Sequence, residues 1–100
     1  MKEDYTAINN NSALTILMPV FNGSKYLKNA IESILNQSYS DFIFLIINDG
    51  STDNSEDIIL SYQDERIKYV KNEFNIGLVK TLNKGVELIE TEFSTSLHAR

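Results

Sequence analysis

The chain has 100 residues, of which 42% are hydrophobic and 23% charged, and this is the size and composition of one small globular domain. Its 14 acidic and 9 basic residues give a formal charge of -5, which argues against nonspecific nucleic-acid binding because that function needs a basic face. The absence of cysteine excludes disulfides, thiolate metal sites and a cysteine nucleophile.

The start of the chain predicts an arm followed by a buried strand. Residues 1–13 lack the apolar core of a signal peptide, and we expect them to form a flexible N-terminal arm before a domain that covers residues 14–100. The run from Leu14 to Val20 is almost entirely apolar, which is typical of a central strand. Its pairing should end near Pro19, because proline has no amide donor.

A turn and an amphipathic helix follow this strand. Phe21, Asn22 and Gly23 form the predicted turn, and Ser24 is a residue type that commonly caps helices. Apolar residues then recur at the spacing of a helix with one buried face. They are Leu27, Ala30, Ile31, Ile34 and Leu35.

The next stretch predicts a buried strand that ends in a polar turn. Phe42 to Ile47 is apolar throughout and is followed at once by Asn48, Asp49, Gly50 and Ser51. In open α/β sheets, ligands bind outside the carboxyl ends of the strands. Asp49 therefore becomes a candidate ligand contact.

The last part of the chain repeats this alternation. A second helix is expected from about Asn54 to Tyr62, capped by Thr52 or Asp53, and a third strand from Ile67 to Val70. After a loop, helical spacing returns at Leu78, Leu82, Gly85, Val86 and Ile89. Residues 92–97 are expected to form a fourth strand.

This order indicates an α/β fold, a Rossmann-like three-layer sandwich with a mostly parallel sheet. Strands that alternate with helices are joined by right-handed crossovers, so helices should cover both faces. With the predicted strands in the spatial order 3-2-1-4, the turn at Phe21 and the turn at Asp49 would face one another across one crevice.

Two residues at that crevice could bind a nucleotide. The ring of Phe21 could stack on a base, although it could equally cap the core under the first helix. The Asp49 carboxylate could accept a hydrogen bond from the imide of a uracil or from a ribose hydroxyl, with Gly50 allowing close approach. The alternative is an Asp-Gly turn without a ligand. Asp53 is expected to be the cap or a first-turn residue of the second helix, and only secondarily a ligand contact.

The start of the third helix is a further candidate for a ligand site. Asn75, Gly77, Lys80 and Asn83 lie at or just inside its start, where an anion could bind, but a capped and solvated helix start explains them as well. No GxGxxG follows the first strand and no GxxxxGK[ST] occurs, so neither a dinucleotide site nor a P-loop is supported. His98 has no partner at metal-ligand spacing.

Several blocks of this sequence together resemble the opening of the family-2 glycosyltransferases. They are residues 15–23, Tyr26-Leu27, residues 30–39, residues 48–55, residues 75–78 and residues 82–85, in the order and spacing of that family over about residues 14–93. The resemblance implies the A-type glycosyltransferase fold, a nucleotide-sugar donor that is usually UDP-linked, and sugar transfer with inversion to a glycan or lipid-linked acceptor. It also implies polysaccharide biosynthesis in the cytoplasm, at the inner face of the membrane.

The resemblance implies roles for individual residues. The aromatic at Phe21 stacks on the base, the aspartate at Asp49 contacts the uracil, and the segment from Asn75 to Asn83 lies near the phosphates. The nucleotide-binding residues expected are Pro19, Val20, Phe21, Asn22, Asp49, Gly50, Ser51, Asn75, Gly77, Lys80 and Asn83.

The sequence departs from the family where a metal motif is expected. The family carries an Asp-x-Asp pair that helps to bind Mn or Mg, and His98, Ala99 and Arg100 occupy that place here. We therefore expect that this chain binds no metal, lacks the catalytic base and is inactive by itself. The alternative is a non-catalytic remnant or a module that self-associates through an open sheet edge.

Overall fold

Strands and helices alternate along the residues that the computed structural model describes, which are 6–10 and 13–93. The elements, in order, are β1 (Thr6–Asn10), β2 (Ala13–Val20), α1 (Leu27–Leu35), β3 (Phe42–Asp49), α2 (Ser55–Leu60), β4 (Ile67–Asn72), α3 (Leu78–Leu88) and the π-helical turn η1 (Ile89–Phe93). The predicted strand–helix alternation is confirmed from β2 to α3.

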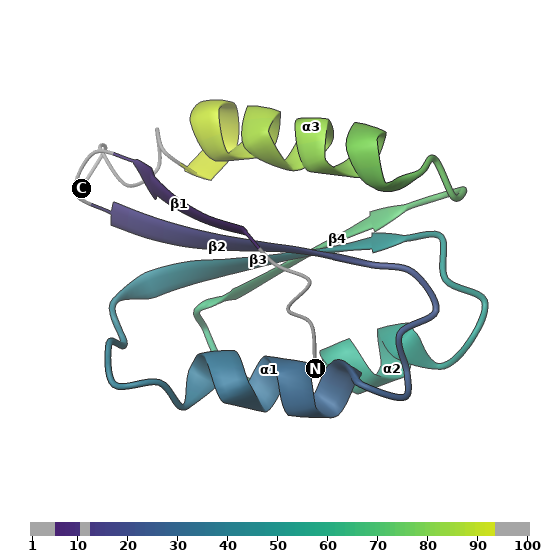
Figure 1. Cartoon of the computed structure of the whole chain (residues 1–100), viewed down its shortest axis with the longest axis horizontal. Helices are drawn as coiled ribbons and strands as arrows, with labels where there is room; N and C mark the ends of the chain where they lie inside the picture. The colour runs from purple at the N-terminus through teal and green to yellow at the C-terminus, as the bar shows by residue number, and fades with distance from the viewer. Residues whose placement is uncertain (1–5, 11–12, 94–100) are drawn as a thin grey trace.

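The strands form one sheet in the order β1-β2-β3-β4, and β2, β3 and β4 run parallel. Helices α1 and α2 cover one face and α3 covers the other, so the predicted three-layer α/β sandwich is confirmed (Figure 1). In the register, Val20 lies beside Asn48, and Asp49 lies beside Asn72. The carboxyl ends of the three parallel strands therefore meet at one edge of the sheet.

The strand beside β2 comes from the N-terminal part of the chain. Residues 1–13 were expected to form a flexible arm, but Thr6–Asn10 form β1, which pairs antiparallel with β2 from Leu17 to Ala13. This pairing covers polar backbone groups that β2 would otherwise expose along that edge. It reaches only to Leu17, whereas the pairing of β2 with β3 continues through Pro19 to Val20, one residue beyond the expected end.

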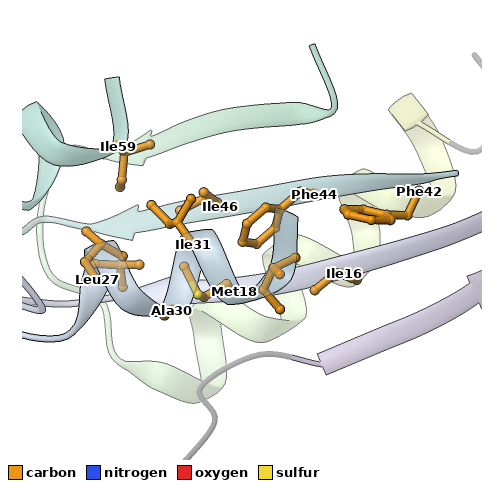
Figure 2. Packing of buried hydrophobic residues seen from close by; sticks show 11 residues of the cluster. Ile16, Met18, Leu27, Ala30, Ile31, Phe42, Phe44, Ile46 and Ile59 are labelled. Atoms are coloured by element: carbon orange, nitrogen blue, oxygen red, sulfur yellow. The ribbon is translucent and has the colours of Figure 1, made fainter. Parts of the chain in front are cut away.

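The larger core lies between the sheet and helices α1 and α2 (Figure 2). The predicted face of α1 is confirmed, since Leu27, Ala30, Ile31 and Ile34 are all buried. They pack against alternate residues of β2 and β3, among them Met18 and Ile46. In α2, Ile59 is buried and Ile58 is half-buried at the margin of this core. The helix ends at Leu60, before the expected end at Tyr62, and Tyr62 is half-buried beside it.

The opposite core is smaller, and α3 lies very close to the sheet there. A Cβ added at Gly85 would lie 2.6 Å from a Leu17 methyl carbon, so the absence of a side chain permits the approach. Thr81, Gly85 and Ile89 are buried at helical spacing. The predicted apolar face is only partly confirmed, because Leu78 is 62% exposed and Val86 is 40% exposed.

The chain is still helical at residues 92 and 93, the first two of the six that were expected to form a fourth strand. Helix α3 continues into η1, which contains residues 92 and 93, and residues 94–100 lie outside the described part. Ile89 is 1% exposed and packs in the α3-side core, so the apolar spacing of α3 extends into η1. No helix in the described ranges is long and apolar enough to cross a membrane.

Candidate functional site

The turns that follow β2 and β3 are joined directly by hydrogen bonds. The Oδ1 atom of Asn22 accepts from the Thr52 amide at 2.7 Å, from the Asp53 amide at 3.2 Å and from the Thr52 hydroxyl at 3.3 Å. In return, the Asn22 amide donates to Ser51 Oγ at 2.9 Å. Asn22 has a φ of 50°, a left-handed conformation that asparagine tolerates better than most residues. The two turns therefore form one hydrogen-bonded unit.

Ser24 and Asp53 extend this unit, and neither occupies a helix cap position, although the Asp53 carboxylate does accept from the first amide of α2. Helix α1 begins at Leu27, and the Ser24 amide donates to Asp53 Oδ2 at 3.1 Å. Asp53 Oδ1 accepts from the Ser55 amide at 3.0 Å, while the cap position of α2 is Asn54. Hydrogen bonds from Ser55, and then from the Ser24 amide, lower the pKa of Asp53 to about 2.

The β2 end of this edge presents one exposed aromatic ring. Phe21 is 49% exposed, so it does not cap the core under α1. Val20 is fully buried, so neither its side chain nor its backbone is exposed to a ligand, and Pro19 is half-buried. Because Phe21 follows β2 and Asp49 ends β3, both lie at the carboxyl edge of the sheet.

Asp49 is buried, and four donors meet its carboxylate. Oδ1 accepts from Asn72 Nδ2 at 3.0 Å and from the Ile76 amide at 2.8 Å. Oδ2 accepts from Asn75 Nδ2 and from the Gly77 amide, both at 2.9 Å. The expected sites Asp49, Asn75 and Gly77 thus come together, but they bond to one another.

The Asp49 carboxyl group is held in its charged form. Burial by itself would raise its pKa, but hydrogen bonds from the Ile76 amide, from Asn72 and from the Gly77 amide outweigh that effect and lower the pKa. A general base needs a pKa near the working pH, and a carboxyl group with a lowered pKa does not meet that need.

Gly50 lies where two segments of backbone pass each other. Its φ is +68°, and a Cβ added there would lie 2.5 Å from the Asn75 nitrogen and 2.6 Å from the Phe74 carbonyl carbon. The sequence suggested that Gly50 admits a ligand, and the structure places the β4–α3 loop against it. The turn after β3 is therefore fixed on both sides, by the β2 turn and by this loop.

Three residues of this site were not identified from the sequence. Asn72 is 3% exposed and donates from Nδ2 to Thr81 Oγ1 at 3.2 Å as well as to Asp49. Its Oδ1 accepts from Lys84 Nζ at 2.6 Å. The available signal was the position of Asn72 at the carboxyl end of a strand parallel to β3. Thr81 lies inside the segment from Asn75 to Asn83 and Lys84 inside the block 82–85 of the family resemblance, but neither was singled out.

The remaining predicted residues are not part of this network. Lys80 and Asn83 are exposed on α3, and His98 and Arg100 lie outside the described residues. Over residues 6–10 and 13–93, no group of three or more His, Cys, Asp or Glu side chains could hold a metal ion. The residues described do not fit a Mn or Mg site, and the absence of metal from the whole chain stays a prediction.

Comparisons with known proteins agree with the fold. The family model described as glycosyl transferase family 2 matches residues 15–99. An uncharacterized glycosyltransferase of Rickettsia typhi is 38% identical over 80 residues, which are 80% of this chain and 24% of the relative. The glycosyltransferase GlyG of Streptococcus pneumoniae is 32% identical over 84 residues, which are 82% of this chain and 28% of the relative. An uncharacterized glycosyltransferase of Methanocaldococcus jannaschii is 39% identical over 90 residues, which are 86% of this chain and 31% of the relative.

The extent of these matches is uneven. They cover most of this chain but only about a quarter to a third of each relative, 24% to 31%. The three parallel strands, with helices on both faces, have the α/β arrangement that the A-type glycosyltransferase fold implies. Because the family model matches more than half of the residues, the chain belongs to glycosyl transferase family 2.

Proposed function

We propose that this chain is the nucleotide-binding part of an inverting glycosyltransferase that uses a UDP-sugar and a glycan or lipid-linked acceptor. The observation that carries the proposal is the hydrogen-bonded union of the β2 and β3 turns beside the exposed ring of Phe21. Parallel strands bind ligands at this end of the sheet. The base would stack on Phe21, and polar groups of the joined turns would meet the rest of the nucleoside.

We also propose that the chain by itself binds nucleotide without transferring sugar. The two aspartates described at this edge, Asp49 and Asp53, have lowered pKa values and accept hydrogen bonds from the chain, so neither is suited to act as the base. The described residues do not fit a divalent metal, which in the family would supply charge neutralisation at the diphosphate.

Replacement of Phe21 tests the proposed site. Stacking of a base on an aromatic side chain contributes about 1–3 kcal/mol, so Phe21→Ala should weaken UDP binding by about tenfold or more. Tyr39→Ala is the matched control, since Tyr39 is 51% exposed but precedes β3, at the opposite end of that strand. Titration calorimetry with UDP measures both variants. Equal affinities for the two variants and the unmodified chain would contradict the site.

Self-association is a second candidate function, favoured by one exposed apolar group. Phe74 is 72% exposed, Leu78 62% and Val79 70%, next to β4 at the edge of the described sheet. Lys68 and Lys71 are exposed on β4 and disfavour direct strand pairing between two copies. The apolar group would therefore carry the contact. Light scattering over a range of concentrations distinguishes the candidates, since a dimer that ignores UDP supports this one and a persistent monomer contradicts it.

A further inference from the structure

The edge of β2 is covered by a strand whose residue types fit it poorly. β1 pairs with β2 over five residues, the stretch from Ala13 to Leu17. Four of these five positions on β2 are apolar, whereas three of the five residues of β1 are threonine or asparagine. The register sets Asn9 opposite Leu14 and Asn10 opposite Ala13. Because asparagine is depleted in strands and apolar pairs stabilise them, this pairing is a weak one.

Thr15, at the centre of that pairing, has a buried hydroxyl without a partner. The residue is 0% exposed, and its Oγ1 atom has no hydrogen-bond partner in the described part of the chain. Its neighbours in the register are Ile8 on β1 and Ile43 on β3, and isoleucine has no side-chain group that forms hydrogen bonds. Burial of an unpaired hydroxyl is costly. A strand that brought a hydroxyl opposite Thr15 would remove that cost.

The position beside β2 is also a regular strand position of this fold. Helices α1 and α2 lie on one face and connect β2 to β3 and β3 to β4, whereas α3 lies on the other face (Figure 1). Because crossovers between parallel strands are right-handed, a crossover through α3 leads back past β3 and β2 to the position that β1 occupies. Helix α3 lies against Leu17 of β2. The edge of β2 is therefore a place where the sheet can continue.

The β2 strand of a second copy would fit this edge better than β1 does. The edge already accepts an antiparallel strand, and Ile8 opposite Thr15 is the middle pair of the five. A second β2 strand in the same antiparallel register would form the pairs Thr15 with Thr15, Leu14 with Ile16 and Ala13 with Leu17. The two hydroxyls would then bond to each other, as facing threonines do in antiparallel sheets, and the remaining pairs would be apolar. Such a contact is closed by a twofold axis.

We propose that β1 is a displaceable cover of the β2 edge, and that its release lets two copies of this chain pair through their β2 strands, antiparallel about Thr15. The β2 edge is then closed within one chain while β1 is paired, and forms a twofold dimer once β1 is released. This contact differs from the apolar group at Phe74, Leu78 and Val79, which lies next to β4 at the other end of the strand order. The inference does not depend on nucleotide binding.

Two prolines in β1 test the proposal in the full chain. Successive amides of a strand point to opposite sides, so one of Ala7 and Ile8 faces β2, and Ala7→Pro with Ile8→Pro removes that donor whichever residue carries it. By sedimentation velocity, this double-proline variant should dimerise at least about tenfold more tightly than the unmodified chain. Ala7→Val with Ile8→Val is the matched control, because it keeps both amides and favours strands, and it should behave like the unmodified chain. Equal association of all three chains would overturn the proposal.

A further substitution separates the two surfaces. Leu78→Lys, added to the double-proline variant, places a charge in the apolar group next to β4 and leaves the β2 edge unchanged. The dimer should persist. Loss of the dimer would assign the contact to that apolar group and would overturn the role of β2.

A single cysteine tests the register. The chain has no cysteine, so Thr15→Cys in the double-proline variant introduces one thiol per copy. Facing residues of an antiparallel pair are close enough for a disulfide, so this variant should form a covalent dimer on air oxidation. Tyr39→Cys in the same variant is the control, since Tyr39 is 51% exposed and lies away from this edge, before β3. Cross-linking that is no faster at position 15 than at position 39 would overturn the proposed axis.

Hydrogen exchange tests the cover without any substitution, and it is available even if the double-proline chain does not fold. In the unmodified chain, amides of β1 that are protected should exchange at least about tenfold faster than those of Leu45 and Ile46 in β3, because β1 opens without global unfolding. Equal protection would make β1 a permanent part of the sheet and refute its release. In a folded double-proline chain, protection of residues 14–17 should rise with concentration. Full protection in a monomer would mean that another segment takes the edge, which would also contradict the proposal.

Discussion

Replacement of Asn22 by alanine should destabilise the chain by about 2 kcal/mol, because this side chain joins the β2 and β3 turns. Its Oδ1 accepts from the amides of Thr52 and Asp53, and each net hydrogen bond contributes about 0.5–1.5 kcal/mol, with the lower end expected at this exposed position. Alanine in the left-handed conformation of Asn22, φ 50°, costs about 1 kcal/mol more. The two effects add because they arise from the side chain and from the backbone.

Urea unfolding followed by circular dichroism measures this loss. Asn29→Ala is the control, since Asn29 is exposed within α1 and its replacement by a better helix former should change stability by less than about 0.5 kcal/mol. A domain of this size is typically stable by about 5–15 kcal/mol, so the Asn22→Ala chain should remain folded. Equal stability of the two variants would refute the idea that Asn22 joins the turns.

Two other substitutions test the same edge. Gly50→Ala should destabilise the chain by more than about 2 kcal/mol, because the φ of +68° disfavours alanine and its Cβ would lie 2.5 Å from the Asn75 nitrogen. Gly77→Ala should also destabilise the chain in the same unfolding assay, by about 1–3 kcal/mol, because φ 98° and ψ 161° essentially require glycine even though an added Cβ would meet nothing within 4 Å, and unchanged stability would contradict this. The folded pKa of Asp53, about 2, lies below its usual 3.8, so its contribution is present above pH 3.8 and is lost as pH falls toward 2. The urea midpoint should therefore fall less between pH 7, 4 and 2 in Asp53→Asn than in the unmodified chain. An equal fall of the midpoint in the two chains would contradict this.

The sequence was sufficient for the features that depend on local periodicity. The apolar run before Asp49 predicted a buried strand, and the spacing from Leu27 to Ile34 predicted the buried face of α1. The alternation of strands and helices then placed Asp49 and Phe21 at one edge, because parallel strands share the direction of their carboxyl ends. Backbone direction and hydrophobic spacing are enough for these inferences.

The features that the sequence did not predict depend on partners far along the chain. Ser24 had the residue type of a helix cap, but its amide instead bonds to Asp53, 29 residues away. The sequence did not indicate the four donors that meet the Asp49 carboxylate, which come from the end of β4 and from the β4–α3 loop, 23 to 28 residues later. The strand β1 follows from pairing with β2 and not from a pattern of its own, so residues 6–10 looked like part of an arm.

The position of a bound nucleotide on the chain tests the central claim most directly. Two-dimensional ¹H–¹⁵N spectra recorded during a UDP titration report each backbone amide separately. We expect saturable shifts at Phe21, Asn22, Gly50 and Ser51, with little change at Ser40 and Asp41 at the opposite end of β3. A folded chain whose shifts cluster away from the β2 and β3 turns, or that shows none at millimolar UDP, would contradict the claim that these turns form a nucleotide site.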